Sequence, residues 1–251
     1  MCTAEGECGE DVIVGVGRKR GQGRSQTLGS VTKSSHVRLC GDEAMEGTNN
    51  FFVRLLTKEG WLDDSNIDMA LHLLRERHNR SGKWAGSDWT ILDTTFQHSN
   101  GLVGIVKGEG HKLAKSCRSV NQVFLPFNLQ RQKHWILLVI DLKECEIRAY
   151  DSKVDLCRTQ AIQRAVQPVS KILPRLLHEA GYIGDGLLRK SEWPVSRVLD
   201  APQQVGGGDC GMYILKYCEF LTSNVDLANI SHHAMPLYRL KLAVQLLQGC
   251  V

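Results

Sequence analysis

The chain has 251 residues, 42% of them hydrophobic and 23% charged, and 31 basic against 27 acidic residues give a net charge of +4. This composition fits a globular protein with one core, or at most two small ones, and it excludes disordered and fibrous chains. The charge is too small to predict nucleic-acid binding, and no apolar run approaches the about 18 residues of a membrane-spanning helix. The basic and apolar regions of a signal peptide are also lacking. We therefore expect an intracellular protein that does not associate with a membrane.

Nine cysteines are scattered along the chain without the spacing of a disulfide framework. Their number is odd, no C-x-x-C occurs, and no His or Cys cluster has metal-ligand spacing. We therefore expect free thiols in a reducing compartment, no bound metal and no cofactor. Most of the thiols should be small buried side chains, and one is a candidate nucleophile. The cysteines are Cys2, Cys8, Cys40, Cys117, Cys145, Cys157, Cys210, Cys218 and Cys250.

Residues 1–48 are predicted to be a flexible, Gly-rich leader that precedes a folded domain over residues 49–251. The leader holds nine of the 24 glycines and none of the 16 aromatic residues, so it can anchor little core. Its basic cluster Arg18-Lys19-Arg20 is either a nuclear-import patch or ordinary solvated charge. The expected localisation is therefore the nucleus, the cytoplasm or both.

From residue 49 onward the hydrophobic periodicity predicts an α+β domain, with helices on both sides of a short strand-rich middle. Ser65 is predicted to cap the second helix, with Asp68 three residues on in a box-like arrangement. Pro168 and Pro174 punctuate the helical patterns that follow the strands, and residues 81–120 are less readable. The expected helices lie around 51–56, 67–74, 159–167, 171–180, 210–222 and 237–248, and the expected strands lie at 123–125, 135–141 and 146–150.

The candidate nucleophile is Cys210, which follows the glycine run 206–208 and opens an apolar helical run. The free N–H groups and the dipole at a helix N-terminus favour a thiolate. Flanking glycines also let a substrate backbone approach closely. The alternative interpretation is a Gly-rich turn before a helix that contains a buried cysteine.

A candidate base and its orienting acid occur on two neighbouring predicted strands. His134 opens one strand and Asp151 follows the next, and their positions sum to 285, so a hairpin centred between Leu142 and Lys143 sets them opposite each other. Directly opposed residues have Cβ atoms about 5 Å apart, within reach of a carboxylate–imidazole hydrogen bond. A base oriented by an acid is what a cysteine nucleophile needs. The alternative is an ordinary His–Asp pair at the margin of a sheet.

A third feature is Gln204, six residues before Cys210. Its amide is a neutral donor that can join the Cys210 backbone N–H in an oxyanion hole. A glutamine pair in a loop carries no information by itself, so this residue gains meaning only beside the other two features.

Together these features resemble the ubiquitin-like-protein-specific cysteine proteases, the SUMO-deconjugating (sentrin-specific) family. The resemblance covers about residues 50–250 and rests on motifs that occur in the family's order and spacing. These motifs are Gly60-Trp61-Leu62-Asp63-Asp64, His134-Trp135, Asp151-Ser152, Pro202-Gln203-Gln204 with Asp209-Cys210-Gly211, and Met235-Pro236-Leu237-Tyr238-Arg239.

The resemblance implies a papain-like α+β fold, with a central mixed sheet flanked by helices. It implies Cys210 as nucleophile and His134 as general base and then as the acid that protonates the leaving amine. Asp151 would orient His134, and Gln204 would stabilise the oxyanion.

The resemblance also implies three substrate-binding residues. Trp61 and Trp135 would roof and floor a tunnel through which only a Gly-Gly tail can pass, although core packing is the commoner role of tryptophan. Asp64 would meet a basic substrate residue, although Asp63 and Asp64 are also ordinary charges for a helix start.

The implied function is a cysteine-type peptidase or isopeptidase that cleaves after the C-terminal Gly-Gly of SUMO or a related ubiquitin-like protein. The reaction would mature precursors, release conjugates or both. The expected partner is that ubiquitin-like protein and its conjugates, and the expected state is a monomer that binds no nucleic acid. The alternatives are a non-catalytic binding module for ubiquitin-like proteins and the same peptidase fold in a mobile-element or viral-type polyprotein.

Overall fold

The structure is a computed structural model that describes residues 37–39, 45–47, 49–110, 112–184 and 192–248. Of the predicted leader 1–48, all but 37–39 and 45–47 lies outside the described residues. The elements in chain order are β1 (Val37–Leu39), β2 (Met45–Gly47), α1 (Asn49–Leu56), α2 (Asp64–Arg80), α3 (Lys83–Gly86), β3 (Trp89–Ile91), η1 (Thr94–Gln97), α4 (Leu102–Lys107), η2 (Cys117–Ser119), β4 (Gln122–Leu129), η3 (Gln130–Gln132), β5 (His134–Asp141), β6 (Glu146–Tyr150), α5 (Thr159–Glu179), β7 (Val195–Val198), α7 (Cys210–Thr222), η4 (Leu227–Asn229), η5 (His232–Ala234) and α8 (Met235–Gln248).

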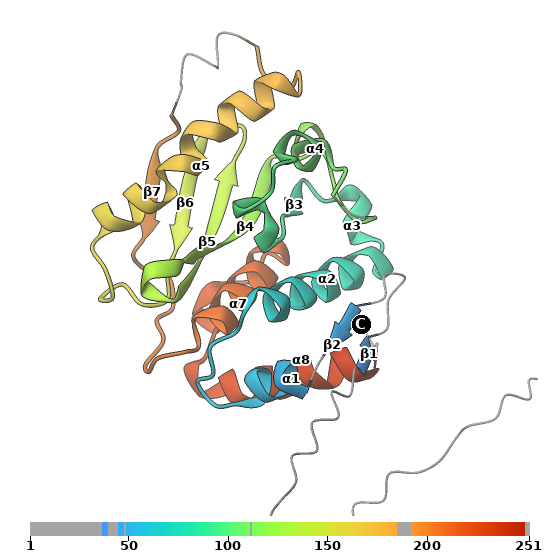
Figure 1. Cartoon of the computed structure of the whole chain (residues 1–251), viewed down its shortest axis with the longest axis vertical. Coiled ribbons are helices and arrows are strands. Elements are labelled where there is room, and N and C mark those ends of the chain that lie inside the picture. Colours follow the sequence, from blue (N-terminus) through green and yellow to red (C-terminus); the bar gives the residue numbers. More distant parts are fainter. Residues whose placement is uncertain (1–36, 40–44, 48, 111, 185–191, 249–251) are drawn as a thin grey trace, which may run out of the picture. The chain divides into compact units, whose positions relative to one another are not determined.

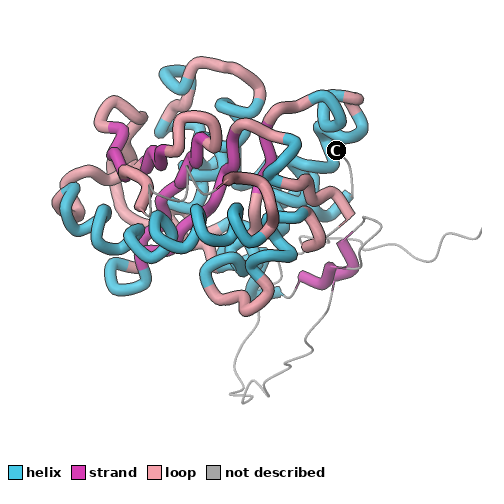
Figure 2. The backbone as a smooth tube through the Cα atoms, turned by 90° about the horizontal axis from the view of Figure 1, so that it is seen from above, coloured by secondary structure: helices cyan, strands magenta, loops and turns pink. Residues whose placement is uncertain are grey.

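A five-stranded mixed sheet in the order β3-β4-β5-β6-β7 forms the centre of residues 49–248. The inner pairs β4–β5 and β5–β6 are antiparallel, and the outer pairs β3–β4 and β6–β7 are parallel. Helix α5 lies against one face of the sheet and α7 against the other (Figure 1). Seen from above, strands run between helices on both sides (Figure 2). The expected α+β architecture with a mixed sheet is confirmed.

The central strand β5 is buried on both faces, which is why it reads as an unbroken apolar run. Trp135, Leu137 and Val139 point into the core shared with α2 and α7. The alternate residues, 136, 138 and 140, point into the core beneath α5. The strand thus fixes the position of the His134–Trp135 pair at its beginning.

The helical patterns at 159–167 and 171–180 form one helix, α5, rather than two. A proline inside a helix removes one backbone hydrogen bond and tends to kink the helix. Here the apolar face continues through both prolines, with Ile162, Val166, Val169 and Leu173 buried against the sheet. Burial of this stripe outweighs the lost backbone bonds, so the predicted break is wrong.

The cap of α2 also differs from the prediction. The N-cap residue is Asp63, whose Oδ1 accepts from the Asn66 backbone N–H at 3.1 Å, and Asn66 Oδ1 accepts from the Asp63 N–H at 3.3 Å. Ser65 lies inside the first turn. Asp68 accepts hydrogen bonds from the backbone and hydroxyl of Thr94 instead. The capping box is therefore two residues earlier than predicted.

The centre of the β5–β6 hairpin lies one residue later than predicted, between Lys143 and Glu144. Asp141 pairs with Glu146, and continuing that register sets Asp151 opposite Ile136, not opposite His134. The shift changes the sum of paired positions by two, and side chains alternate with a period of two. His134 and Asp151 therefore remain on one face as diagonal neighbours, within reach of each other.

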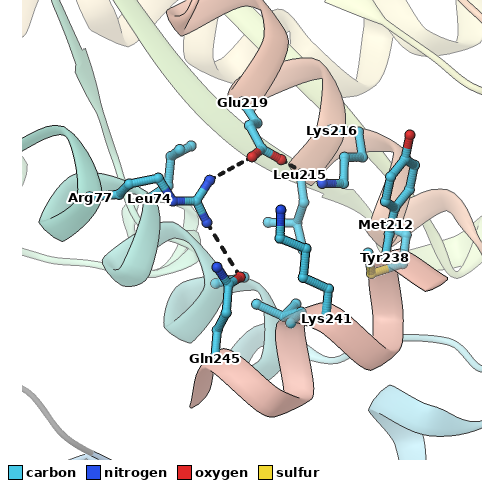
Figure 3. Close-up of a pocket in the computed structure, with 11 residues that line it drawn as sticks. Leu74, Arg77, Met212, Leu215, Lys216, Glu219, Tyr238, Lys241 and Gln245 are labelled. Carbon is cyan, nitrogen blue, oxygen red and sulfur yellow. Dashed lines mark hydrogen bonds and ion pairs between the residues drawn. The ribbon is translucent and has the colours of Figure 1, made fainter. Parts of the chain in front are cut away.

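Helix α7, which begins at Cys210, is anchored to α2 and α8 at a polar cluster around Glu219 (Figure 3). Arg77 Nη1 donates to Glu219 Oε1 at 2.5 Å and Lys216 Nζ donates to Oε2 at 2.5 Å. Burial acts to raise the pKa of Glu219, but Lys216 and Arg77 outweigh it and lower the pKa. Arg77 also donates to Gln245 of α8 at 3.4 Å. Arg77 therefore links α2 to the Glu219 carboxylate of α7 and to Gln245 of α8.

Within the described part of the chain, no helix combines the length and apolarity needed to cross a bilayer.

Candidate active site

Cys210 is the first residue of α7, and 2% of its surface is exposed. The helix is buried along the apolar run after Cys210, where Met212, Tyr213 and Ile214 enter the core. This packing carries the N-terminus of α7 to the edge of the sheet at which β5 begins and β6 ends, and α7 contacts β5. The thiol therefore lies at the positive end of a helix.

His134 and Asp151 form a buried hydrogen-bonded pair at that edge of the sheet. His134 is the first residue of β5, and Asp151 directly follows β6. His134 Nε2 lies 2.7 Å from Asp151 Oδ1, and the side chains are 3% and 0% exposed. The structure thus brings together the base and acid that the sequence singles out, by a diagonal rather than a direct strand pairing.

The electrostatics of the pair favour a charged imidazolium beside a carboxylate. Burial acts to lower the pKa of His134, but hydrogen bonds to Asp151 and to Cys210 outweigh burial and raise it to about 9. Burial acts to raise the pKa of Asp151, and the hydrogen bonds from His134 and the Lys153 N–H hold it below its ordinary value. The Cys210 contact shows that all three side chains belong to one cluster.

The raised pKa of His134 predicts a pH dependence of stability. The folded protein binds this proton more tightly than the unfolded chain does, whose histidine titrates near 6.5. The contribution is therefore full below about pH 6.5 and is lost as pH rises through about 9. Urea unfolding of the protein and of His134→Gln should show a difference in the free energy of unfolding that shrinks over this range. A difference independent of pH would contradict the prediction.

Gln204 lies in the loop before Cys210, and its backbone is paired with the Asp151 segment. Its N–H donates to the Ser152 carbonyl at 2.8 Å. The side chain is buried, and its carboxamide oxygen has no hydrogen-bond partner among the described residues. The backbone bond thus holds Gln204 beside the segment that carries Asp151, and its carboxamide oxygen accepts no hydrogen bond from the described residues.

Gln203, to which the sequence assigns no separate role, fastens this loop to the acid. Its Nε2 donates to the Asp151 carbonyl at 2.8 Å, and its Oε1 accepts from the Val154 N–H at 2.9 Å. Its own carbonyl accepts from the Tyr213 hydroxyl of α7 at 2.9 Å. One residue therefore links the acid segment to the nucleophile helix.

The glycine run before Cys210 packs against the segment that precedes Trp61. Gly208 has φ +81°, and a Cβ on it would overlap the Glu59 carbonyl oxygen. A side chain at Gly211 would likewise come within 2.9 Å of Leu62 Cβ. Gly208 is needed because two backbone segments approach closely, and Gly211 is needed because the Leu62 side chain lies against it. Both reasons are separate from the substrate access that the sequence predicts.

Arg239, present in the C-terminal motif but given no role there, joins the same two segments. Its guanidinium donates to Asp209 Oδ1 at 2.6 Å and to the Gly60 carbonyl at 2.7 Å. The side chain is 2% exposed and the Asp209 side chain 5%. A planar guanidinium can serve several such acceptors at once. It therefore holds the residue before Cys210 and the residue before Trp61 in fixed relation.

Trp61 and Trp135 face each other. Their ring centroids lie 6.1 Å apart with an interplanar angle of 20°. Trp135 is fully buried and its Nε1 donates to the Leu62 carbonyl at 2.8 Å, whereas Trp61 is only partly buried. The two indoles therefore lie face to face, and both also pack against the core.

Asp64, the remaining predicted binding residue, is exposed at the first turn of α2. The neighbouring Asp63 caps the helix and forms an ion pair with Arg54. Asp63 is therefore engaged in the cap, whereas Asp64 is the exposed member of the pair. Cys218, eight residues after Cys210, is fully buried, as expected.

A thiol at a helix N-terminus that interacts with a buried histidine, itself hydrogen-bonded to a carboxylate, defines a cysteine protease site. The mixed sheet with helices on both faces places that site on a papain-like α+β fold.

The sequence profile described as the Ulp1 protease family, C-terminal catalytic domain, matches residues 60–250. The chain belongs to the Ulp1 protease family, which confirms the resemblance of its motifs.

Curated relatives carry names consistent with this family. The ubiquitin-like-specific protease ESD4 of Arabidopsis thaliana is 28% identical over 216 residues, covering 78% of this chain and 39% of the relative. Human sentrin-specific protease 2 is 26% identical over 201 residues, covering 78% of this chain and 31% of the relative. The chain thus spans about a third of the length of such relatives.

Solved structures support the fold. The C-terminal Ulp1 protease domain in complex with Smt3, the yeast ortholog of SUMO, superposes with a TM-score of 0.62 at 20% identity, covering 86% of this chain and 90% of that one. The Ulp1-like SUMO protease catalytic domain of Chaetomium thermophilum gives 0.61 at 19% identity, with 84% and 82% covered. The papain-like architecture expected from the resemblance is confirmed.

Proposed function

We propose that residues 49–251 form a catalytic domain that hydrolyses the bond after the C-terminal Gly-Gly of SUMO or a related ubiquitin-like protein. The observation that carries the proposal is the buried His134–Asp151 pair, hydrogen-bonded through His134 to Cys210. The names of the relatives and the Smt3-bound neighbour indicate the substrate class. Precursor maturation and conjugate release both break an amide bond to the carbonyl carbon of the terminal glycine.

In the proposed reaction the Cys210 thiolate attacks the carbonyl carbon of the terminal glycine. The carbonyl oxygen takes the negative charge, where the Gln204 amide and the Cys210 N–H stabilise it. His134 then gives its proton to the leaving amine, the C–N bond breaks, and a thioester remains on Cys210. His134, now neutral, takes a proton from water, and the hydroxide released attacks the thioester and frees both the carboxylate and the thiol.

The tryptophan pair would select a Gly-Gly tail. A chain held between two rings needs van der Waals contact on both sides, about 7 Å between the planes, and the centroids are 6.1 Å apart. One indole must therefore shift when substrate enters. Trp135 is fully buried and hydrogen-bonded, so the proposal assigns this movement to Trp61. The exposed Asp64 beside it would meet a basic residue of the substrate.

A covalent probe tests the proposed function. The protein and Cys210→Ala would be incubated with a panel of ubiquitin-like proteins that carry a C-terminal electrophile, and labelling rates would be compared. The expected result is an adduct on the unchanged protein with SUMO-type probes, faster than with ubiquitin, and none on Cys210→Ala. Absence of an adduct with every panel member, or tight binding of Gly-Gly-linked substrate without turnover, would refute the proposal.

Gln204→Ala is expected to lower kcat by about 100- to 1,000-fold with little change in KM, because the oxyanion develops only in the transition state. The backbone bond from Gln204 to Ser152 survives the substitution. Hydrolysis of a SUMO–Gly-Gly fluorogenic amide measures both constants, and the exposed Gln160→Ala is the control. An unchanged kcat would remove Gln204 from the oxyanion hole.

A further inference from the structure

The Asp151 carboxylate has a second charged partner on the side away from His134. Arg197 Nη2 donates to Asp151 Oδ2, while Oδ1 accepts from His134 and, at 2.8 Å, from the Lys153 N–H. The Arg197 and Asp151 side chains are 4% and 0% exposed. Both carboxylate oxygens are therefore occupied inside the protein, one by the histidine and the other by a guanidinium.

The sheet places Arg197 there through the pairing of its last two strands. Strands β6 and β7 are parallel, with Arg197 opposite Ala149. Asp151 lies two residues beyond Ala149, so its side chain points to the same face at the edge where both strands end. The sequence predicts neither this strand nor a role for this arginine, because β7 is a four-residue strand outside every recognised motif.

The guanidinium is held independently of the acid. Arg197 Nη1 donates to the Cys157 carbonyl at 2.9 Å, and Nη2 also approaches the Lys153 carbonyl at 3.4 Å. These carbonyls belong to the loop between β6 and α5. The position of the Arg197 guanidinium therefore does not depend on Asp151 alone, because two backbone carbonyls also hold it.

We propose that Arg197 is a positioning residue of the thiol protease reaction, keeping Asp151 charged and oriented during the steps in which His134 is neutral. The proposal rests on the proposed function. After His134 has protonated the leaving amine, Asp151 loses the cation on Oδ1 and remains a buried carboxylate. Arg197 keeps its charge throughout the cycle. Oδ1 is therefore still aimed at His134 when the histidine must accept a proton from water.

The effects that raise and lower the pKa of Asp151 support the positioning role of Arg197. Burial acts to raise the pKa of Asp151, and the hydrogen bonds and charges of His134, the Lys153 N–H and Arg197 lower it. Of the two cations, His134 gives up its proton during the proposed reaction, whereas a guanidinium remains charged. Together with the Lys153 N–H, Arg197 therefore supplies the part of the stabilisation that does not vary with the catalytic step, and Arg197 is the member of that pair that carries a full charge.

Steady-state kinetics on a SUMO–Gly-Gly fluorogenic amide test the proposal in the full chain. Arg197→Met is expected to lower kcat by about 10- to 100-fold with KM within about twofold, because misorientation of the base affects only the chemical steps. Arg197→Lys keeps the charge but loses the bidentate geometry of the guanidinium. Its kcat should be about fivefold or more above that of Arg197→Met. Arg175→Met, at an exposed position on α5, is the matched control.

A double-mutant cycle separates positioning from a general structural role. In an Asp151→Asn background there is no carboxylate to keep charged, so adding Arg197→Met should change kcat by less than about twofold. Independent losses that multiply in the double variant would overturn the proposal, as would an Arg197→Met enzyme with unchanged kcat. If Arg197→Met does not unfold cooperatively, Arg197→Gln replaces it, and failure of both to fold would also overturn the positioning role.

These outcomes are distinct from a failure of the proposed function. A protein that does not react with any ubiquitin-like probe refutes the function before Arg197 is tested. A protein that reacts normally but is indifferent to Arg197 substitution refutes only the positioning role.

Discussion

Cys210→Ala is expected to lower kcat by about a million-fold, to the level of the uncatalysed reaction plus what binding alone supplies. In the proposed reaction the thiol forms the covalent bond to the substrate, and no neighbouring side chain in the cluster can replace it, because His134 and Asp151 would act on protons only. Hydrolysis of a SUMO–Gly-Gly fluorogenic amide measures the loss, and KM should change little.

The matched control is Cys218→Ala on the same helix. Cys218 is fully buried, and burial raises the pKa of its thiol above the ordinary range. We expect normal kcat with a destabilisation of about 1 kcal/mol from the small cavity. If Cys210→Ala kept its activity and Cys218→Ala lost it, Cys210 would not be the nucleophile.

Asp151→Asn is expected to lower kcat by about 10,000-fold, because an amide neither holds the same histidine tautomer nor stabilises its charged form. The same substitution should move the alkaline limb of the kcat/KM profile to lower pH. Burial acts to lower the pKa of His134, and the hydrogen bond to Asp151 is the first of the effects that raise it to about 9. Without the carboxylate, His134 loses its proton at a lower pH and ceases to serve as the acid.

The profile of residual activity against pH would be measured for Asp151→Asn beside Asp155→Asn, whose side chain is 73% exposed and contacts Lys153. The control should keep the native profile. A residual activity that falls at the native alkaline pH would mean that Asp151 does not set the protonation of His134.

Local patterns predict much of the architecture correctly. The buried strand at His134–Asp141 is recognisable because six apolar residues in a row suit a strand that is covered on both faces. The helix after Cys210 is recognisable for the same reason, since its run of large side chains follows a glycine loop. The predicted cap of α2 is wrong by two residues, because several Asp, Ser and Asn residues near Asp63 can each cap the helix. The predicted hairpin centre is wrong by one residue, because the length of a hairpin loop is not fixed by the strands alone.

Residues 81–120 illustrate why other parts are not predictable. Strand β3 has three residues, and its pairing with β4 is parallel. Such a short strand carries no periodicity of its own, and it is stabilised by a neighbour distant in the sequence. Strand β7, with four residues, is missed for the same physical reason.

The sequence alone was enough to single out Cys210, His134, Asp151 and Gln204, because each lies at the end of a recognisable element or beside one. Their assembly, by contrast, depends on contacts between distant segments. Gln203, Arg197 and Arg239 are polar side chains whose partners are backbone groups and carboxylates 30 or more residues away, except for one contact of Gln203 within its own loop.

The nine cysteines show the same division. Counting and spacing exclude a disulfide framework, and the glycine loop before an apolar helix distinguishes one thiol from the rest. Only packing sets that thiol beside a histidine, because the sheet edge, the α7 terminus and the Gly208–Glu59 contact must coincide in space. The chemistry that a residue can perform follows from its type and its neighbours in the sequence. The residues that it contacts depend on which buried surfaces the folded chain brings together.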